Sequence, residues 1–344
     1  MDSRSRRRTG SRKDHRRMAR RRHRHDDESR VMADHGPEAG GGAMSTSRGL
    51  TLLVLLVLVL GGAAIAVEKD ALRTPSGCRA AEGAKASHHG YADRIAHEKT
   101  GIELILVKPG KFIMGASKYR SNDLAHPVTL KRAYYMARTE VTNAQFRRFM
   151  KANPDYDGRA DVDPDDDLYL RHLRGKSIMS PDDDFPVVWV SWNNARAFCR
   201  WAGLKLPTET QWEYACRAGT STLYYYGDDR KAFHDYGWAH AGRDSENYYT
   251  HPVAAKLPNA WGFHDMLGNV WEWVEDDWQE NFVGAPNDDT ARIIDDAFTK
   301  VVRGGSWGNN TAPHNVGCSA RYNSAPTNAC PEFGFRVVLQ IDGP

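Results

Sequence analysis

The 344-residue chain lacks several patterns that define common functional classes. No segment of roughly 20–50 residues repeats along it, which argues against solenoids and propellers. Its aspartate clusters lack the spacing, central glycine and terminal glutamate of an EF-hand calcium loop. Six histidines of the body could serve as iron ligands, but none of them shows the H-x-D/E or H-x3-H spacing of an iron site. The sequence therefore allows an iron site without supporting one. These histidines are His126, His234, His240, His251, His264 and His314.

Residues 1–48 contain few apolar side chains, so this segment has little from which to build a core. Residues 1–30 hold 13 lysines and arginines against 5 aspartates and glutamates, which leaves 34 against 39 in the rest of the chain. We therefore expect a disordered basic tail over residues 1–48 and a mildly acidic folded body. No nucleic-acid partner is expected for that body.

Residues 49–67 form an uncharged hydrophobic run with the length of a membrane anchor or a signal-peptide core. Counted from Met1, the run is an anchor with a basic cytoplasmic flank. Counted from Met44, it follows a short basic n-region and ends in the A-x-A pattern of Ala64–Ala66, and the residues before Met44 are then not translated. Both alternatives export the rest of the chain, to the periplasm or another extracytoplasmic space, free or anchored in the inner membrane. Residues 68–99 are predicted to form a linker.

The five cysteines fit export. Cys78 falls in the predicted linker, which leaves four in the body. An even number of cysteines in an exported domain indicates two disulfides. These four are Cys199, Cys216, Cys318 and Cys330.

Residues 100–344 mix short strands with three helices, which predicts one compact α+β domain with little regular secondary structure. Apolar runs flank the turn dipeptide Pro109-Gly110. Helices are expected to begin at Thr142, Ser191 and Thr208, because each is an N-capping residue followed by apolar positions at helical spacing. Two of these starts carry the T-x-x-Q pattern of a capping box. The helix after Thr208 is expected to close at Gly219.

Five stretches in order carry a resemblance: "GKFIMGA", "HPVTLKRAYYMARTEVTNAQFRRFM", "PVVWVSWNNARAFCRWAGLKLPTETQWEYACRAG", "PNAWGFHDMLGNVWEWVEDDW" and "VVRGGSW…GFRVV". Together they resemble the formylglycine-generating enzyme family, also called the sulfatase-modifying factor domain. The resemblance implies a disulfide-stapled α+β domain related to C-type lectins. Active members of that family oxidise a cysteine of sulfatases to formylglycine with O₂ and Cu(I).

The resemblance also shows a departure at the copper site. Two thiolates hold Cu(I) in active members, since soft sulfur ligands select that ion. Counted from Ser306, their positions fall on Asn309 and His314; counted back from Cys318, they fall on Gly308 and Pro313. Neither register supplies a cysteine, so copper and formylglycine-generating activity are not expected. The resemblance pairs Cys216 with Cys318, which leaves Cys199 for Cys330.

A calcium site is better preserved in the resemblance. Its ligands carry over to the side chains of Asp265 and Glu272 and to the backbone carbonyls of Gly268 and Val270, all suitable hard oxygen donors. The alternative is that Glu272 pairs with an arginine, either Arg303 or Arg336. Ca²⁺ would be structural rather than catalytic.

Ser306 and Trp271 correspond to residues that lie beside the copper in active members. Together with Asn309 and His314 they are the candidate residues of a cleft. We therefore expect an exported, calcium-stabilised relative without oxidase activity, whose cleft binds a peptide, glycan, protein segment or small molecule. Two alternatives remain: a periplasmic enzyme, either a metal-dependent oxidase or a tailoring enzyme of secondary metabolism, and a scaffold in an envelope complex.

Overall fold

The computed structural model describes residues 72–116, 125–162, 169–175, 178–240 and 249–341. Residues 68–344 form one compact unit. The predicted basic tail and the hydrophobic run at residues 49–67 lie outside the described residues. Within the described ranges, no helix has both the length and the apolar character needed to cross a membrane.

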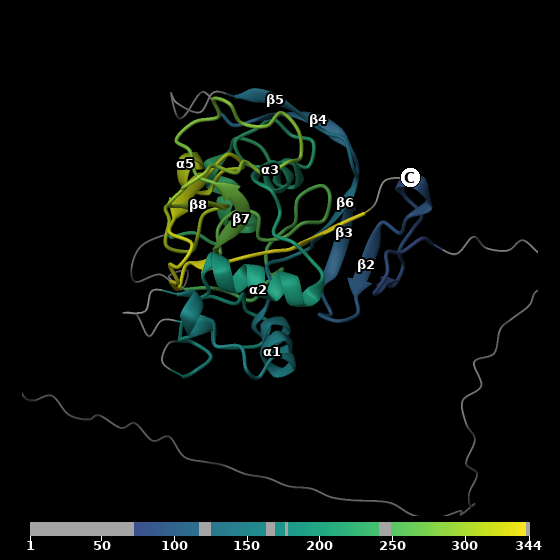
Figure 1. Cartoon of the computed structure of the whole chain (residues 1–344). Helices are drawn as coiled ribbons and strands as arrows, with labels where there is room; N and C mark the ends of the chain where they lie inside the picture. Colours follow the sequence, from purple (N-terminus) through teal and green to yellow (C-terminus); the bar gives the residue numbers. More distant parts are fainter. Residues whose placement is uncertain (1–71, 117–124, 163–168, 176–177, 241–248, 342–344) are drawn as a thin grey trace, which may run out of the picture. The chain divides into compact units, whose positions relative to one another are not determined.

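One antiparallel sheet has five strands in the order β1-β2-β3-β6-β11. Figure 1 shows β2, β3 and β6 on one side of the domain. The strands span Cys78–Ala80 (β1), Arg94–His97 (β2), Glu103–Val107 (β3), Tyr134–Ala137 (β6) and Val338–Gln340 (β11).

The linker prediction for residues 68–99 is wrong over the part that the structure describes. Strands β1 and β2 pair with each other, and β2 pairs with β3. Ile95 is completely buried, and the Tyr135 hydroxyl donates to the backbone carbonyl of Ala92 at 2.6 Å. Strands β1 and β2 have only three and four residues, so the sequence shows no clear alternation of apolar and polar positions there. Their few apolar side chains nevertheless enter the core.

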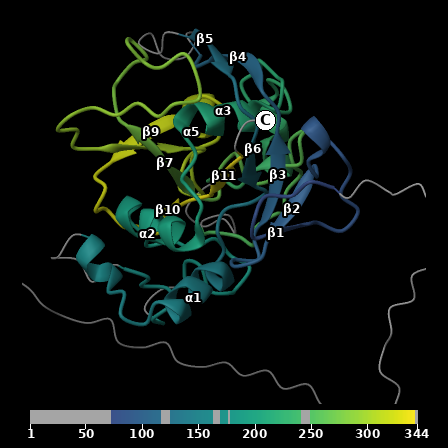
Figure 2. The ribbon, with the colours of Figure 1, turned by 45° about the vertical axis from the view of Figure 1, so that its right-hand side comes forward.

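A second sheet has the order β10-β7-β8-β9, and β4 pairs with β5 in a separate ribbon. In this four-stranded sheet, β10 runs parallel to β7, whereas β7, β8 and β9 run antiparallel to their neighbours. Figure 2 shows β7, β9 and β10 on one side and β1, β2 and β3 on the other. The strands span Gly110–Met114 (β4), His126–Leu130 (β5), Trp271–Asp277 (β7), Lys300–Arg303 (β8), Arg321–Ser324 (β9) and Phe333–Gly334 (β10).

The three expected helices are confirmed, each starting from a capping box: α1 (Asn143–Ala152) after Thr142, α2 (Trp192–Ala202) after Ser191 and α3 (Glu209–Arg217) after Thr208. In Figures 1 and 2, α1 and α2 lie at one end of the domain and α3 at the other, near β4. The predicted end of α3 is one residue late: Ala218 is the C-cap in the left-handed conformation, and Gly219, also at a positive φ of 92°, follows it.

The remaining helical segments are single turns. Two are α-helical and three are 3₁₀, and they lie in the connections between the longer elements. They span His88–Gly90 (η1), Gly158–Asp161 (η2), Arg230–Ala232 (η3), Phe233–Tyr236 (α4) and Pro313–Val316 (α5).

All five cysteines are free thiols in the structure. Cys216 and Cys318 are nevertheless neighbours: their thiols are within hydrogen-bond contact, and the pKa of Cys216 is raised, first by burial and then by the Cys318 thiol. Cys199 is buried against the core, and Cys330 packs at its margin. The pairings Cys216–Cys318 and Cys199–Cys330 stay predictions, the first of them supported by proximity.

A buried ion pair joins the two larger sheets. Arg336, in the connection from β10 to β11, donates from Nε and a terminal nitrogen to the two carboxylate oxygens of Glu272, both at 2.6 Å. The same guanidinium donates to the carbonyls of Ala137, at the end of β6, and His264. Neither charged side chain is exposed. A fully bonded pair of this kind tolerates burial, whereas one partner left alone does not.

We expect Arg336→Met to destabilise the domain by about 3–5 kcal/mol, because it leaves the Glu272 carboxylate buried without its cation. The double variant Arg336→Met/Glu272→Met should lose less, since no uncompensated charge remains. Urea unfolding of the three proteins measures the difference. Equal losses in the single and double variants would show that packing, rather than charge compensation, dominates here.

Candidate functional site

A closed network of polar groups surrounds Ser306, directly after β8. The Ser306 hydroxyl donates to the Glu332 carboxylate and lies 3.1 Å from the Asn309 side-chain oxygen. That oxygen also accepts the Ser306 backbone N–H at 2.9 Å, and the Ser306 hydroxyl oxygen accepts the Gly308 N–H at 3.2 Å. With every partner engaged and no exposed area, Ser306 is a positioned structural hydroxyl rather than a free nucleophile.

Glu332 is a site residue that the sequence analysis missed. It stands just before β10, and its backbone carbonyl accepts the Trp271 N–H at 2.7 Å. A side chain at position 308 would start 2.8 Å from the Glu332 carboxylate, so the glycine leaves room for that carboxylate. The available signal was an acidic residue directly before the "FGFR" run, although nothing in the sequence placed it beside Ser306.

Aromatic side chains form the surroundings of this network. Trp271, at the start of β7, is buried, and its ring centroid lies 5.9 Å from that of Tyr322. Tyr322 is 53% exposed. Buried Trp307 donates from Nε1 to the carbonyl of Pro331 at 3.2 Å. Ser306 therefore contacts the Glu332 side chain and Trp271 contacts its backbone carbonyl, and the half-exposed Tyr322 ring lies beside Trp271.

The structure separates the roles of Asn309 and His314. Asn309 is partly buried, and its side-chain oxygen Oδ1 accepts the Ser306 backbone N–H. The backbone carbonyl of Asn309 accepts the His240 backbone N–H at 2.7 Å. His314 lies on the single turn α5 and is exposed. Asn309 thus belongs to the framework of the loop, whereas His314 belongs to its surface.

Two buried carboxyl groups, Glu140 shortly before α1 and Asp265 shortly before β7, lie in contact. The carboxyl groups of Glu140 and Asp265 are hydrogen-bond partners, and each residue is 1% exposed. Asp265 also accepts the Ala254 N–H at 2.6 Å, and Glu140 accepts the Asn269 amide at 3.0 Å. One oxygen of each carboxyl, Asp265 Oδ1 and Glu140 Oε2, has no donor among the described residues.

Two carboxylates in contact repel unless a proton or a cation lies between them. Burial raises the pKa of Asp265 to about 6, and burial together with the charge of Asp265 raises the pKa of Glu140 well above its usual range. Without a cation, the pair therefore retains a proton near neutral pH. Glu140 was missed by the sequence analysis: its run "ARTEVT" lies within a stretch that carries the resemblance, but nothing in the sequence placed it beside Asp265.

Of the other predicted calcium ligands, Gly268 and Val270 follow Asp265 closely along the chain, whereas the Glu272 carboxylate is already paired with an arginine. Gly268 has φ +85°, and an added Cβ would lie 1.9 Å from the Trp238 carbonyl, so this position requires glycine. Val270 is fully buried beside it. Glu272 is engaged by Arg336 and by the Trp212 indole at 2.8 Å, which is the alternative that the sequence analysis left open.

The donor set nevertheless suits a hard cation. Within the described residues, no three side chains of His, Cys, Asp or Glu gather as metal ligands would. Ca²⁺ also accepts backbone carbonyls and water, so two carboxylate oxygens without donors offer it a starting pair. Bound there, Ca²⁺ would supply the positive charge that the shared proton otherwise provides.

Comparison with known proteins shows the family of the chain. Residues 92–341 match the sulfatase-modifying factor enzyme 1-like domain, and the chain belongs to that family. It is 28% identical to the formylglycine-generating enzyme of Bos taurus, over 88% of this chain and 96% of that protein. It is 34% identical to the inactive C-alpha-formylglycine-generating enzyme 2 of Bos taurus, over 44% of this chain and 50% of that one.

A solved structure, PvdO from Pseudomonas aeruginosa, shares the fold. The match has a TM-score of 0.59 with 24% identity and covers 71% of this chain and 96% of PvdO. The predicted mixed α+β class and the predicted family are therefore confirmed.

The carboxyl pair predicts a defined dependence of stability on pH. Because the pKa of Asp265 is raised to about 6 in the folded state, its protonated form stabilises the metal-free fold below about pH 4, and this contribution is lost as the pH rises through 6. Asp265→Asn should remove about 3 kcal/mol of that dependence, since asparagine keeps a neutral amide and tolerates the positive φ of this position.

The measurement is urea unfolding of both proteins in metal-free buffer between pH 4 and pH 7. Titrating groups away from this pair, such as Asp276, are common to both proteins and cancel in the difference, whereas the pKa of Glu140 falls in the variant because the Asp265 charge no longer raises it. A difference that stays constant over this range would contradict the shared proton.

Proposed function

We propose that the chain is an exported, calcium-stabilised member of its family that binds a ligand beside Ser306 and does not oxidise cysteine. The observation that carries this proposal is the loop after β8. Asn309, at one expected thiolate position, is committed to Ser306, and no thiol stands at the other, His314. Without two sulfur ligands, Cu(I) has no preferred site in this loop.

Two further observations support the binding role. A relative named as an inactive formylglycine-generating enzyme matches this chain over 44% of its length, so loss of that activity has a precedent in the family. Exposed side chains near Trp271 and in the loop after Ser306 are Tyr322, whose ring lies 5.9 Å from that of Trp271, and Asn310 and His314. An accessible tyrosine among amides is a common composition for protein, peptide and glycan recognition.

A copper-binding experiment tests the assignment of the two positions. We expect no Cu(I) binding at this loop, and no conversion of a cysteine-containing sulfatase peptide to the aldehyde under O₂. The double variant Asn309→Cys/His314→Cys should gain Cu(I) binding. Competition with a chromogenic Cu(I) chelator measures the affinity of each protein for the ion.

The matched control is Gly308→Cys/Pro313→Cys, which represents the other register. It should bind no Cu(I), because a side chain at 308 meets the Glu332 carboxylate. Aldehyde formation by the unaltered protein would refute the proposal, and copper binding by the control alone would show that the register is wrong.

The calcium part of the proposal rests on the unpartnered oxygens of Glu140 and Asp265. Saturating Ca²⁺ at about 100 times its Kd should stabilise the fold by about 2.7 kcal/mol, or raise the Tm by about 5–10 °C for a domain of this size. Glu140→Gln removes one anionic oxygen and keeps its shape, so most of this rise should disappear. The exposed change Glu98→Gln should leave the rise intact.

Differential scanning calorimetry with and without Ca²⁺, and with Mg²⁺ for comparison, measures these shifts. An equal rise in Glu140→Gln, or none in the unaltered protein, would exclude this calcium site.

A periplasmic enzyme, acting as a metal-dependent oxidase or on a secondary metabolite, is the second candidate. The partly exposed Glu332 carboxylate favours it, since a carboxylate in hydrogen-bond contact with a hydroxyl is suited to accept a proton. Iron or copper bound in stoichiometric amount by the chain purified from an oxidising compartment would favour this candidate over the binding role.

A further inference from the structure

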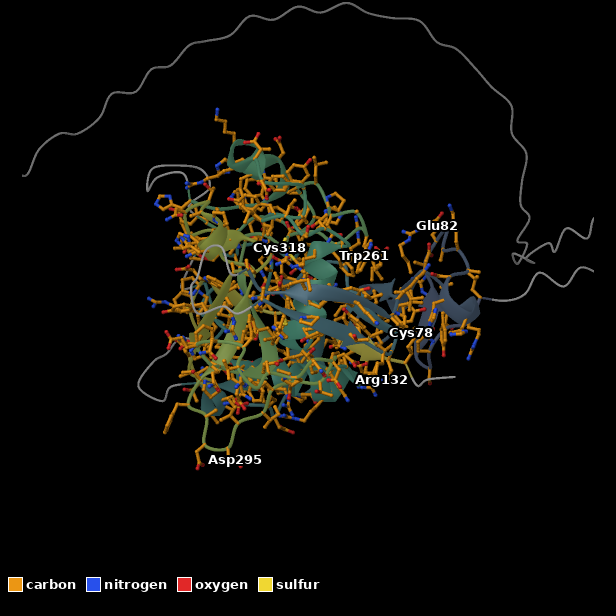
Figure 3. All side chains as sticks on the ribbon, turned by 90° about the horizontal axis from the view of Figure 1, so that it is seen from above. Cys78, Glu82, Arg132, Trp261, Asp295 and Cys318 are labelled. Atoms are coloured by element: carbon orange, nitrogen blue, oxygen red, sulfur yellow. The ribbon has the colours of Figure 1, made fainter. Side chains whose placement is uncertain are left out.

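A cavity of about 640 Å³ lies apart from the Ser306 network, beside α2 and the N-terminal end of α3. Its walls come from α2, from the connection between α2 and α3, from β7 and from the ends of β11 and of the segment at Asp289–Ala291. Figure 3 shows Arg132, one of its lining residues, at the edge of the domain near the C-terminal strand. A volume of this order accommodates a small organic molecule.

The α2–α3 connection is a fixed wall rather than a loose loop. Lys205 exchanges two backbone hydrogen bonds with Val338 of β11, at 2.8 and 3.0 Å. Two residues on, the Pro207 carbonyl accepts the Glu275 N–H of β7 at 2.9 Å. The connection is therefore held from both sheets, and the side chains that it presents to the cavity start from a defined backbone.

Positive charge exceeds negative charge around this cavity. Four cationic residues line it, against the two carboxylates Glu275 and Asp289. Each carboxylate already has a cation, because Arg196 pairs with Glu275 and Arg132 pairs with Asp289 at 3.4 Å. The other two cations, Arg200 and Lys205, have no side-chain hydrogen bond or ion pair within the described residues.

A buried donor at the same cavity is also unused. Gln211 lines the cavity and has no exposed area. Its side-chain oxygen accepts the Thr208 N–H at 3.1 Å and completes the capping box of α3, whereas its Nε2 has no partner among the described residues. A buried N–H₂ group without an acceptor is costly, which indicates that an acceptor from outside the described chain completes it.

The remaining lining is apolar. Leu204, Leu206 and Ile341 are buried residues of the cavity wall. An inorganic anion alone would leave this surface unused, whereas an ester with a compact apolar body would cover it. Two cations and an amide donor favour a tetrahedral oxyanion, which offers several acceptor oxygens at once.

We infer that this cavity binds a small phosphate or sulfate monoester, with the oxyanion at Arg200, Lys205 and Gln211 Nε2 and the apolar body against Leu204, Leu206 and Ile341. This ligand site is independent of the Ser306 loop and of the calcium proposal. Glu332→Gln should therefore leave it unchanged.

Isothermal titration calorimetry with phenyl phosphate and phenyl sulfate, at constant ionic strength, tests the inference on the domain from residue 68 onward, which forms one compact unit. We expect saturable binding of one molecule per chain. The double variant Arg200→Gln/Lys205→Gln, which changes two exposed side chains, should bind at least about tenfold more weakly. Arg79→Gln, an exposed change on β1 away from the cavity, is the matched control and should bind as the unaltered domain does.

A second variant separates anion recognition from general surface charge. Gln211→Glu keeps the side-chain oxygen that the capping box needs but replaces the unpartnered amide with an acidic oxygen, so ester binding should be lost. The buried carboxylate should also lower the Tm, so circular dichroism at the titration temperature checks that the variant is folded. Unchanged binding in Gln211→Glu or in the double variant would overturn the inference, as would no saturable binding of either ester. Inorganic phosphate binding as tightly as phenyl phosphate would overturn the role of the apolar wall.

Discussion

The bidentate contact between Arg336 and Glu272 is the constraint on which the arrangement of the domain depends. The guanidinium reaches the end of β6, the His264 carbonyl and the β7 carboxylate from a single buried position. A buried charge pair is tolerable only when its geometry is nearly complete, so β6 and β7 have one favourable placement relative to each other. Trp271 precedes Glu272 directly, and Asp265 follows His264. The positions of both candidate sites are therefore set by the same interaction.

A second set of buried charges continues this arrangement around α3. Glu213 binds both Arg217 and Arg303, and Glu209 forms a two-point contact with Arg321. These arginines come from α3, β8 and β9, so the carboxylates of one short helix hold the neighbouring sheet. In a domain with short strands and long connections, such directional contacts fix distances that regular packing does not. Each requires a particular side chain, which explains how short runs such as "WEW" and "GFR" identify the family.

The sequence predicted the features that depend on local chemistry. Thr142, Ser191 and Thr208 start their helices because capping is decided within four residues, and the strands on either side of Pro109-Gly110 follow from short apolar runs. Strands β1 and β2 escaped notice, because their burial depends on β3, which lies further along the chain. Glu332 and Glu140 were missed for the same reason: each acquires its role from a partner 26 and 125 residues away, respectively, Ser306 and Asp265. The absence of the two copper-binding cysteines at Asn309 and His314 could be predicted from the sequence, because it requires only counting residues from Ser306.

The network around Ser306 has a consequence for how this loop can change. Its shape is held by groups inside it: the Ser306 backbone, the Asn309 amide and the Glu332 carboxylate, together with Gly305, where an added Cβ would lie 2.4 Å from Val316. Asn310 also supports the loop, since its Oδ1 accepts the Ala312 N–H and the Asn315 amide, both at 2.9 Å, whereas the exposed side chains of Tyr322 and His314 are not among these groups. Natural variation could therefore exchange these two exposed side chains for others and alter which molecules are recognised while the backbone stays the same, so descendants of one scaffold could acquire different specificities through substitutions at a few surface positions.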